Sequence, residues 1–320
     1  MATYKGTHGT KIQNYTSDPA NPLVGEVWYN STSNSLKYFY VDSGSWSTGS
    51  LLNTGRRNLA GTGIKTAALA FGGRSPGAIA VTEAYNGTSW TEVNDLNVAR
   101  YDLAGAGTKT SALAFGGITN PGQRAETELW NGTNWAAVNA LNNARTALAG
   151  AGASNTAALA FGGINPPSIG VKTESWNGTN WTNVNDMNTA RASLGGCGTN
   201  TAALGFGGNG GDTLTELWNG SNWTAVNVLN NGRRDLGAAG ITTSALAFGG
   251  YESAKTESWN GTNWTEVNAL ATARGFLGQA GANNTSALAF GGEITNGGPP
   301  GSALTEEWNV GPTTATIGTS

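Results

Sequence analysis

The sequence has few of the side chains that bind metals or form disulfides. Among 320 residues it has one cysteine, Cys197, and one histidine, His8. A lone cysteine cannot form a disulfide within the chain, and one of each residue is too few for the usual His/Cys metal sites. No Asp-x-Asp-x-Asp-Gly calcium loop occurs. We therefore expect no metal and no cofactor, and we interpret Cys197, which lies between glycines, as a small buried side chain.

Charge and long apolar runs are also scarce. Charged residues make up 12% of the chain, the net charge is -3, and lysine and arginine form no run. This composition excludes the basic footprint that binds phosphate backbones, so we expect no nucleic-acid partner. No stretch approaches 18 apolar residues, and the N-terminus lacks the apolar region of a signal peptide. We expect no membrane insertion.

What the chain does contain is a repeat. Its unit is an alternating apolar run ending in Phe-Gly-Gly, followed by Thr-Glu, an aromatic residue, usually Asn-Gly, a tryptophan, and an arginine ten residues after that tryptophan. The phenylalanines are spaced by 44, 46, 45, 42 and 42 residues and are Phe71, Phe115, Phe161, Phe206, Phe248 and Phe290. A period of this length predicts one small β-sheet per repeat.

The second repeat shows how four strands fit into one unit. Residues 100–107 predict a first strand of small side chains, and residues 111–115 a second strand that ends at two glycines. Residues 126–130 predict a third strand, which Asn131-Gly132 connects to a fourth through a tight turn, because both turn positions require φ > 0. Four antiparallel strands in about 45 residues are typical of a propeller blade.

The two ends of the chain predict how such a ring closes. The last repeat ends after its third strand at Trp308, whereas the first matching piece, residues 46–52, is a fourth strand without a complete third strand before it. We expect residues 46–52 to complete the blade that begins near Phe276. The fold predicted is an all-β propeller of six four-stranded antiparallel blades over residues 46–309, with an extension at 1–45 and a tail at 310–320.

The order of apolar strand, Gly-Gly, variable stretch, Thr-Glu-x-Trp, Asn-x-Trp-x-x-Val-x-x-Leu and arginine resembles the kelch motif over residues 46–309. Tryptophan stands where kelch proteins usually have tyrosine, and Asn-Gly stands where they usually have Asp-Pro. The resemblance implies a six-bladed kelch-like propeller, in which the repeated glutamate pairs with the repeated arginine at the crossing between blades.

Residues 25–46 are similar to a short β-hairpin segment of bacteriophage tail-fibre and other virion proteins. The segment runs from Gly25-Glu-Val-Trp28 through Leu36-Lys-Tyr-Phe-Tyr to Gly44-Ser-Trp46. The Asn/Thr/Gly-rich repeats also resemble those of phage structural proteins. The resemblance implies a location on a virion, as a fibre or decoration protein, with other virion proteins or copies of itself as partners.

The six repeated Glu/Arg sets permit two interpretations. A sialidase-like, glycan-processing enzyme gathers arginines and acids at the propeller axis. Catalysis, however, requires one acid and one nucleophile in different environments, whereas residues that every repeat needs are building parts. We therefore predict a non-enzymatic protein in which these residues are structural.

The segments between the second and third strands differ from repeat to repeat, and in a blade they all emerge on one face. Loops on a rigid scaffold commonly carry binding residues. We therefore predict that this face binds a host-surface glycan or protein. A purely structural fibre subunit, whose loops contact only neighbouring copies, remains the alternative. The candidate binding residues are Arg74, Asn120, Arg124, Asn165, Asp212, Tyr251, Glu252 and Asn296.

Overall fold

The computed structural model describes residues 12–209, 213–294 and 301–317, and over these residues the protein is all-β. The chain divides into two compact units, one of residues 46–309 and one of residues 1–45 together with 310–320. No helix in the described part of the chain is long and apolar enough to cross a membrane.

The smaller unit is one mixed sheet in the order β1-β2-β3-β34. Its strands are β1 (Gln13–Tyr15), β2 (Val27–Asn30), β3 (Ser35–Val41) and β34 (Pro312–Thr316). The hairpin predicted from the sequence is β2 and β3, which pair antiparallel. Residues 312–316, expected to lie in a tail, instead pair with β3. Three of these five residues are threonines, whose β-branched side chains favour strands, but only tertiary structure provides the strand edge that they pair with.

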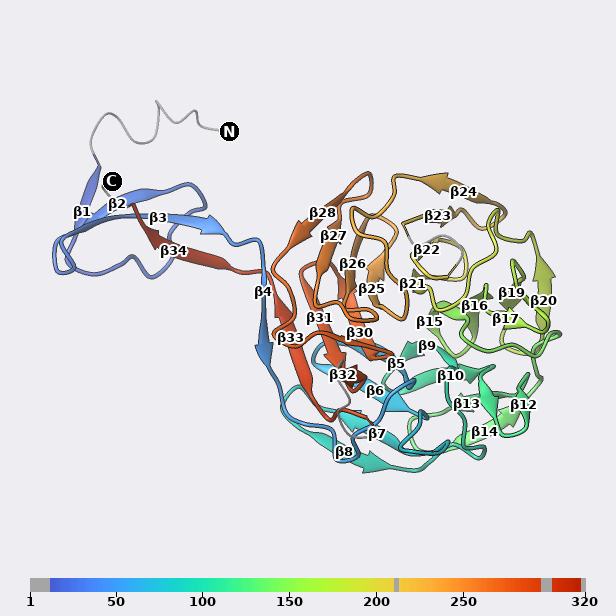
Figure 1. Cartoon of the computed structure of the whole chain (residues 1–320). Helices are drawn as coiled ribbons and strands as arrows, with labels where there is room; N and C mark the ends of the chain where they lie inside the picture. The colour runs from blue at the N-terminus through green and yellow to red at the C-terminus, as the bar shows by residue number, and fades with distance from the viewer. Residues whose placement is uncertain (1–11, 210–212, 295–300, 318–320) are drawn as a thin grey trace. The chain divides into compact units, whose positions relative to one another are not determined.

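The larger unit contains six four-stranded sheets among its described residues, arranged radially in a propeller-like manner (Figure 1). The first sheet is β5 (Ala60–Ile64), β6 (Ala67–Phe71), β7 (Thr82–Tyr85) and β8 (Trp90–Val93). The second is β9 (Ala104–Thr108), β10 (Ser111–Phe115), β13 (Thr127–Trp130) and β14 (Trp135–Val138). The third is β15 (Ala149–Ser154), β16 (Ala157–Phe161), β19 (Thr173–Trp176) and β20 (Trp181–Val184).

The remaining three sheets follow the same plan. The fourth is β21 (Gly195–Gly198), β22 (Ala203–Phe206), β23 (Thr215–Trp218) and β24 (Trp223–Val226). The fifth is β25 (Gly237–Ile241), β26 (Ser244–Phe248), β27 (Thr256–Trp259) and β28 (Trp264–Val267). The sixth is β30 (Gly278–Asn283), β31 (Ser286–Phe290), β33 (Thr305–Asn309) and β4 (Ser45–Thr48). The early strand β4 thus shares a sheet with strands from the other end of the repeat region, as expected for residues 46–52.

Short two-stranded ribbons extend from three of the repeats. They are β11 (Ile118–Thr119) with β12 (Gly122–Gln123), β17 (Ile164–Asn165) with β18 (Ser168–Ile169), and β29 (Arg274–Gly275) with β32 (Glu293–Ile294). The first two ribbons lie in the loops between second and third strands. Of the loops that are described in full, those of the second and third repeats therefore form ribbons, and those of the first and fifth are shorter and irregular.

The first strands are shorter than the sequence predicted. We expected the first strand of the second repeat to begin at Arg100, but β9 begins at Ala104. The reason is that Asp102 has φ of 52°, a left-handed conformation that a strand does not accommodate. The same conformation recurs at the equivalent position of every repeat, as described below.

The core lies between neighbouring sheets and is built from the repeated aromatic residues. Second-strand residues such as Leu69 and Phe71 are fully buried, because sheets cover both of their faces. The indole of Trp135 packs against the Phe71 ring of the preceding sheet, with centroids 5.0 Å apart, and its Nε1 donates a hydrogen bond to Thr82 Oγ1 of that sheet at 3.0 Å. The other five fourth-strand tryptophans make the same pair of contacts, and they are Trp46, Trp90, Trp181, Trp223 and Trp264.

Candidate binding site

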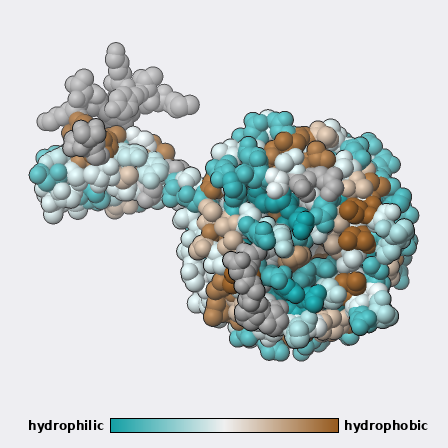
Figure 2. Space-filling model, in the orientation of Figure 1, coloured by the Kyte–Doolittle hydropathy of each residue, from teal (hydrophilic) through white to brown (hydrophobic). Residues whose placement is uncertain are grey.

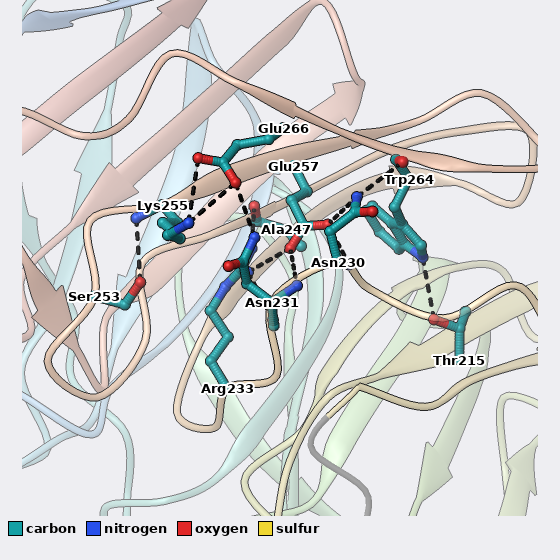
Figure 3. A network of polar contacts seen from close by, with 10 residues as sticks. All are labelled: Thr215, Asn230, Asn231, Arg233, Ala247, Ser253, Lys255, Glu257, Trp264 and Glu266. Carbon is teal, nitrogen blue, oxygen red and sulfur yellow. Dashed lines mark hydrogen bonds and ion pairs between the residues drawn. The ribbon is translucent and has the colours of Figure 1, made fainter.

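The repeated glutamate and arginine form a buried ion pair in each of the six sheets. Figure 3 shows the fifth: Arg233 Nη1 donates to Glu257 Oε1 at 2.6 Å, while the backbone N and Nδ2 of Asn230 donate to Glu257 Oε2 at 2.7 and 2.8 Å. Burial lowers the pKa of Arg233, and Glu257 opposes that shift. The remaining pairs are Arg56–Glu83, Arg100–Glu128, Arg145–Glu174, Arg191–Glu216 and Arg274–Glu306. The pairing expected from the sequence is confirmed, and both partners are at most 5% exposed in every case.

The residue that lies two positions after each of these arginines bonds to its equivalents in the neighbouring repeats. Together the six residues form a closed cycle of backbone hydrogen bonds, which we call the collar. The backbone N of each collar residue donates to the carbonyl O of the collar residue before it, at 2.8 or 2.9 Å, and the first donates to the last. All six have φ between 52° and 58°. The collar consists of Asn58, Asp102, Ala147, Ser193, Asp235 and Phe276.

The collar residues share a backbone conformation but not a side-chain chemistry. Together with the leucines that follow them they line a small cavity of about 90 Å³. Burial raises the pKa of Asp102, and the hydrogen bond that Asn58 Nδ2 donates to it opposes the shift. Burial and the charge of Asp102 raise the pKa of Asp235 to about 6, although hydrogen bonds from Ser193 and Arg234 act in the other direction. Two carboxyl groups that are costly to ionise therefore line one cavity.

Asp102 and Asp235 were not predicted as site residues, because the aspartates of the sequence share no common motif. A signal was nevertheless present. The position two residues after the repeated arginine is variable in an otherwise strict register, and such variation inside a repeat marks a position where the scaffold tolerates different chemistry.

The predicted binding residues of the second and third repeats stay on their own ribbons. Arg124 Nε donates to Thr119 Oγ1 at 2.8 Å, and its Nη1 lies 3.3 Å from Glu126 Oε1. Asn120 is exposed between β11 and β12, and Asn165 is exposed in β17. Among the described residues, no hydrogen bond or ion pair joins any two of these three side chains, so they are not brought together in one pocket.

Arg74 and Tyr251 each take part in a stack of guanidinium on tyrosine. The Arg74 Cζ lies 4.9 Å from the centroid of Tyr101, and the Arg234 Cζ lies 4.8 Å from the centroid of Tyr251. Glu252, next to Tyr251, is exposed and has φ of 57°. Two further predicted residues, Asp212 and Asn296, lie outside the described residues.

A larger cavity, of about 340 Å³, lies beside Tyr251, and we call it the Tyr251 pocket. It is lined by Asn231, Gly232, Arg233, Arg234, Tyr251, Ser253 and Lys255. Of these residues the sequence predicted only Tyr251. Arg234 and Lys255 were missed because they lie 21 residues apart in the chain, and only the packing of the third strand beside the preceding crossing brings them together.

The face of the larger unit that Figure 2 shows has polar side chains around its middle and separate apolar patches nearer its rim. No group of three or more His, Cys, Asp or Glu side chains in the described ranges could hold a metal ion. Neither a scan against protein-family models nor a search of curated proteins found a match to this chain.

Proposed function

We propose that residues 46–309 form a closed, six-bladed, kelch-like propeller in which β4 completes the sixth blade. Three observations support this proposal. The Trp–Thr hydrogen bonds run from each sheet to the one before it and return from the first sheet to the sixth, where Trp90 Nε1 donates to Thr305 Oγ1 at 3.1 Å. The innermost strands contact one another in sequence, and β30 contacts β5. The collar makes the same circuit through the backbone.

We further propose that the protein is a non-enzymatic virion component, a fibre or decoration protein at the particle surface, whose loop face binds a host-surface glycan or protein. One observation carries this proposal: the glutamate and arginine that recur in every sheet are buried and form ion pairs with each other, whereas exposed and chemically varied side chains such as Asn120, Asn165 and Glu252 lie in the loops between second and third strands. A scaffold with satisfied repeats and individual loops suits recognition. The N-terminal unit then serves as the attachment to other virion proteins or to copies of the chain.

The experiment replaces all six loops with uniform short ones and measures adsorption of the protein to host cells and to a glycan array. Loss of adsorption with a retained melting temperature is the expected result. A folded variant that still binds like the parent would refute the loop-face proposal, and a parent protein that binds only its own copies would favour the purely structural fibre subunit.

A second function, glycan processing, is favoured by one specific observation. Asp235 has its pKa raised to about 6, and it lines the same cavity as Asp102. A carboxyl group with such a pKa can act as a general acid near neutral pH. Incubation of the protein with host-surface polysaccharide distinguishes the two functions: released oligosaccharide that disappears in Asp235→Asn would establish the enzyme, and intact polysaccharide agrees with a binding protein.

A further inference from the structure

The Tyr251 pocket is bordered by an unusually short loop. In the fifth repeat only residues 251–255 separate the two glycines of Phe-Gly-Gly from Thr256, the shortest such segment in the chain. No ribbon like β11–β12 or β17–β18 forms there. Because a short loop covers less of the adjoining crossing, the side chains of Arg234 and Lys255 are left about half exposed, at 48% and 45%. The pocket is therefore open to solvent and close in size to the smallest sites that hold small ligands.

The charged groups of the pocket are not equivalent. Arg233 forms a buried ion pair with Glu257. Lys255 Nζ lies 3.0 Å from Glu266 Oε2, and Asn231 Nδ2 donates to the same oxygen at 2.9 Å (Figure 3). Arg234 makes one ion pair among the described residues, from Nε to Asp235 Oδ2 at 3.4 Å. Its two terminal nitrogens have no protein partner within that part of the chain, so a free guanidinium fork remains.

A stack on Tyr251 holds this fork. The guanidinium lies over the tyrosine ring, and the rings of Tyr251 and Phe276 of the collar are nearly perpendicular, with centroids 6.4 Å apart. Stacking holds the planar cation in place without using its hydrogen-bond donors. A fork held in this way matches the two oxygens of a carboxylate.

The other lining groups suit the hydroxyls of a sugar. Ser253 Oγ accepts a hydrogen bond from Lys255 N at 3.2 Å and keeps its own O–H for a ligand. Asn231 uses Nδ2 for Glu266, and its Oδ1 has no partner among the described atoms. Tyr251 is 45% exposed and offers a rigid, amphipathic contact surface. No carboxylate lines the pocket.

We propose that the Tyr251 pocket binds one carboxylate-bearing sugar residue of an acidic glycan, with the carboxylate paired to the terminal nitrogens of Arg234. This inference rests on the proposed glycan-binding function and narrows it to a ligand class and one site. The proposal predicts a single site per chain. Among the described residues, no other repeat combines an arginine whose terminal nitrogens are free with so short a loop.

Calorimetric titration of the full chain tests the proposal, with an oligomer of glucuronic acid, a glucose oligomer of equal length and a sulfated glucose oligomer as probes. We expect one site per chain for the glucuronic acid oligomer and binding to the glucose oligomer at least about tenfold weaker, the difference made by a charge-assisted pair of hydrogen bonds. Arg234→Gln should remove that preference. Equal affinity for the sulfated oligomer, or tighter binding of an aspartate-rich peptide, would overturn the carboxylated-sugar assignment.

The matched control is Lys172→Gln, which removes an exposed cation of the third repeat that pairs with Asp186 and lies outside the Tyr251 pocket. It should leave the affinity for the glucuronic acid oligomer unchanged, and both variants should keep the parental melting temperature because neither side chain is buried. If Arg234→Gln binds the glucuronic acid oligomer like the parent, the assignment of the binding site to the Tyr251 pocket is wrong. Adsorption to host cells is then measured with the six-loop graft, so that failure of the pocket and failure of the loop-face proposal are separate results.

Discussion

At the scale of single residues, the protein separates structural polar groups from available ones by burial and pairing. Glu174 is completely buried, and it accepts hydrogen bonds from Arg145 Nη1 at 2.7 Å and from the backbone N and Nδ2 of Asn142 at 2.7 and 2.8 Å. Arg234 and Lys255, by contrast, are half exposed. The position of a charge in the repeat therefore decides whether it stabilises the fold or can meet a ligand.

Replacement of Glu174 by alanine should lower the free energy of unfolding by about 3–5 kcal/mol, because it leaves Arg145 buried and unpaired. Denaturant titration measures the loss. The control is Glu126→Ala, whose side chain is 41% exposed and which should change stability by less than about 0.5 kcal/mol. Similar losses in the two variants would contradict the structural role of Glu174.

Asp235 should give stability a distinct pH dependence. Its pKa is raised in the folded protein to about 6 from 3.8, so the folded state binds the proton more tightly than the unfolded state. The resulting stabilisation is complete below pH 3.8 and is lost as the pH rises through 6. We expect wild type, relative to Asp235→Asn, to be about 2–3 kcal/mol less stable at pH 7.5 than at pH 4. A difference between the two proteins that does not vary with pH would contradict this assignment.

At the scale of elements, the first strand of each sheet is built for close approach to its neighbours. In β5, a Cβ at Gly61 would lie 2.5 Å from the carbonyl O of Gln279 and would also overlap the ring of Phe290. Glycine is therefore required there by contact with the adjoining sheet rather than by its own backbone angles. The small side chains that the sequence predicted for the first strand are therefore the ones that allow neighbouring sheets to approach closely.

Gly61→Ala should destabilise the protein by about 1–3 kcal/mol, the usual cost of overpacking a filled interior. Gly77→Ala provides the control, because a Cβ at Gly77 would meet no atom within 4 Å, and its stability should match the parent within about 0.5 kcal/mol. Thermal unfolding of both variants measures the difference. A Gly61→Ala protein that melts with the parent would mean that β5 and β30 are less tightly packed than the structure indicates.

At the scale of the whole molecule, the sixth sheet depends for one of its strands, β4, on a distant part of the sequence. In the sixth sheet the backbone continues to pair beyond β4, where Gly49 N donates to Thr305 O and Leu52 N to Ala303 O, at 2.8 and 2.9 Å. Trp46 packs between Phe248 and Trp308, with ring centroids 5.0 and 5.4 Å away. Residues 45–53 therefore connect the two ends of the repeat region.

Two fragments test this dependence. Residues 45–309 should fold cooperatively without the smaller unit, whereas residues 54–309 should be largely unfolded, since their sixth sheet exposes an unpaired edge and loses the packing of Trp46. Circular dichroism and a thermal melt of each fragment provide the comparison. A fragment 54–309 that melts at the same temperature as 45–309 would refute closure through β4.

Much of this architecture was predictable because it repeats. Strict spacing of Phe-Gly-Gly, the third-strand glutamate and the fourth-strand tryptophan determined the all-β class, the strand order within a sheet and the Glu–Arg pairs, since a local pattern that occurs six times leaves little freedom in its interpretation. The six-bladed count and the closure drawn from the same spacing stay predictions that the fragments test. The virion location and the loop-face ligand also stay predictions.

What the sequence alone could not decide depends on distance in space. The pairing of β34 with β3 arises because the edge of β3 is available. Nothing in the sequence of residues 312–316 indicates which strand they pair with. The collar arises because six left-handed residues, spaced 41 to 46 positions apart along the chain, hydrogen-bond to one another only when the sheets are assembled. The Tyr251 pocket likewise needs a stacked arginine from one segment and a short loop that carries Lys255 from another. Repetition along the chain determined the elements, and packing between repeats determined which of their side chains are left free to bind.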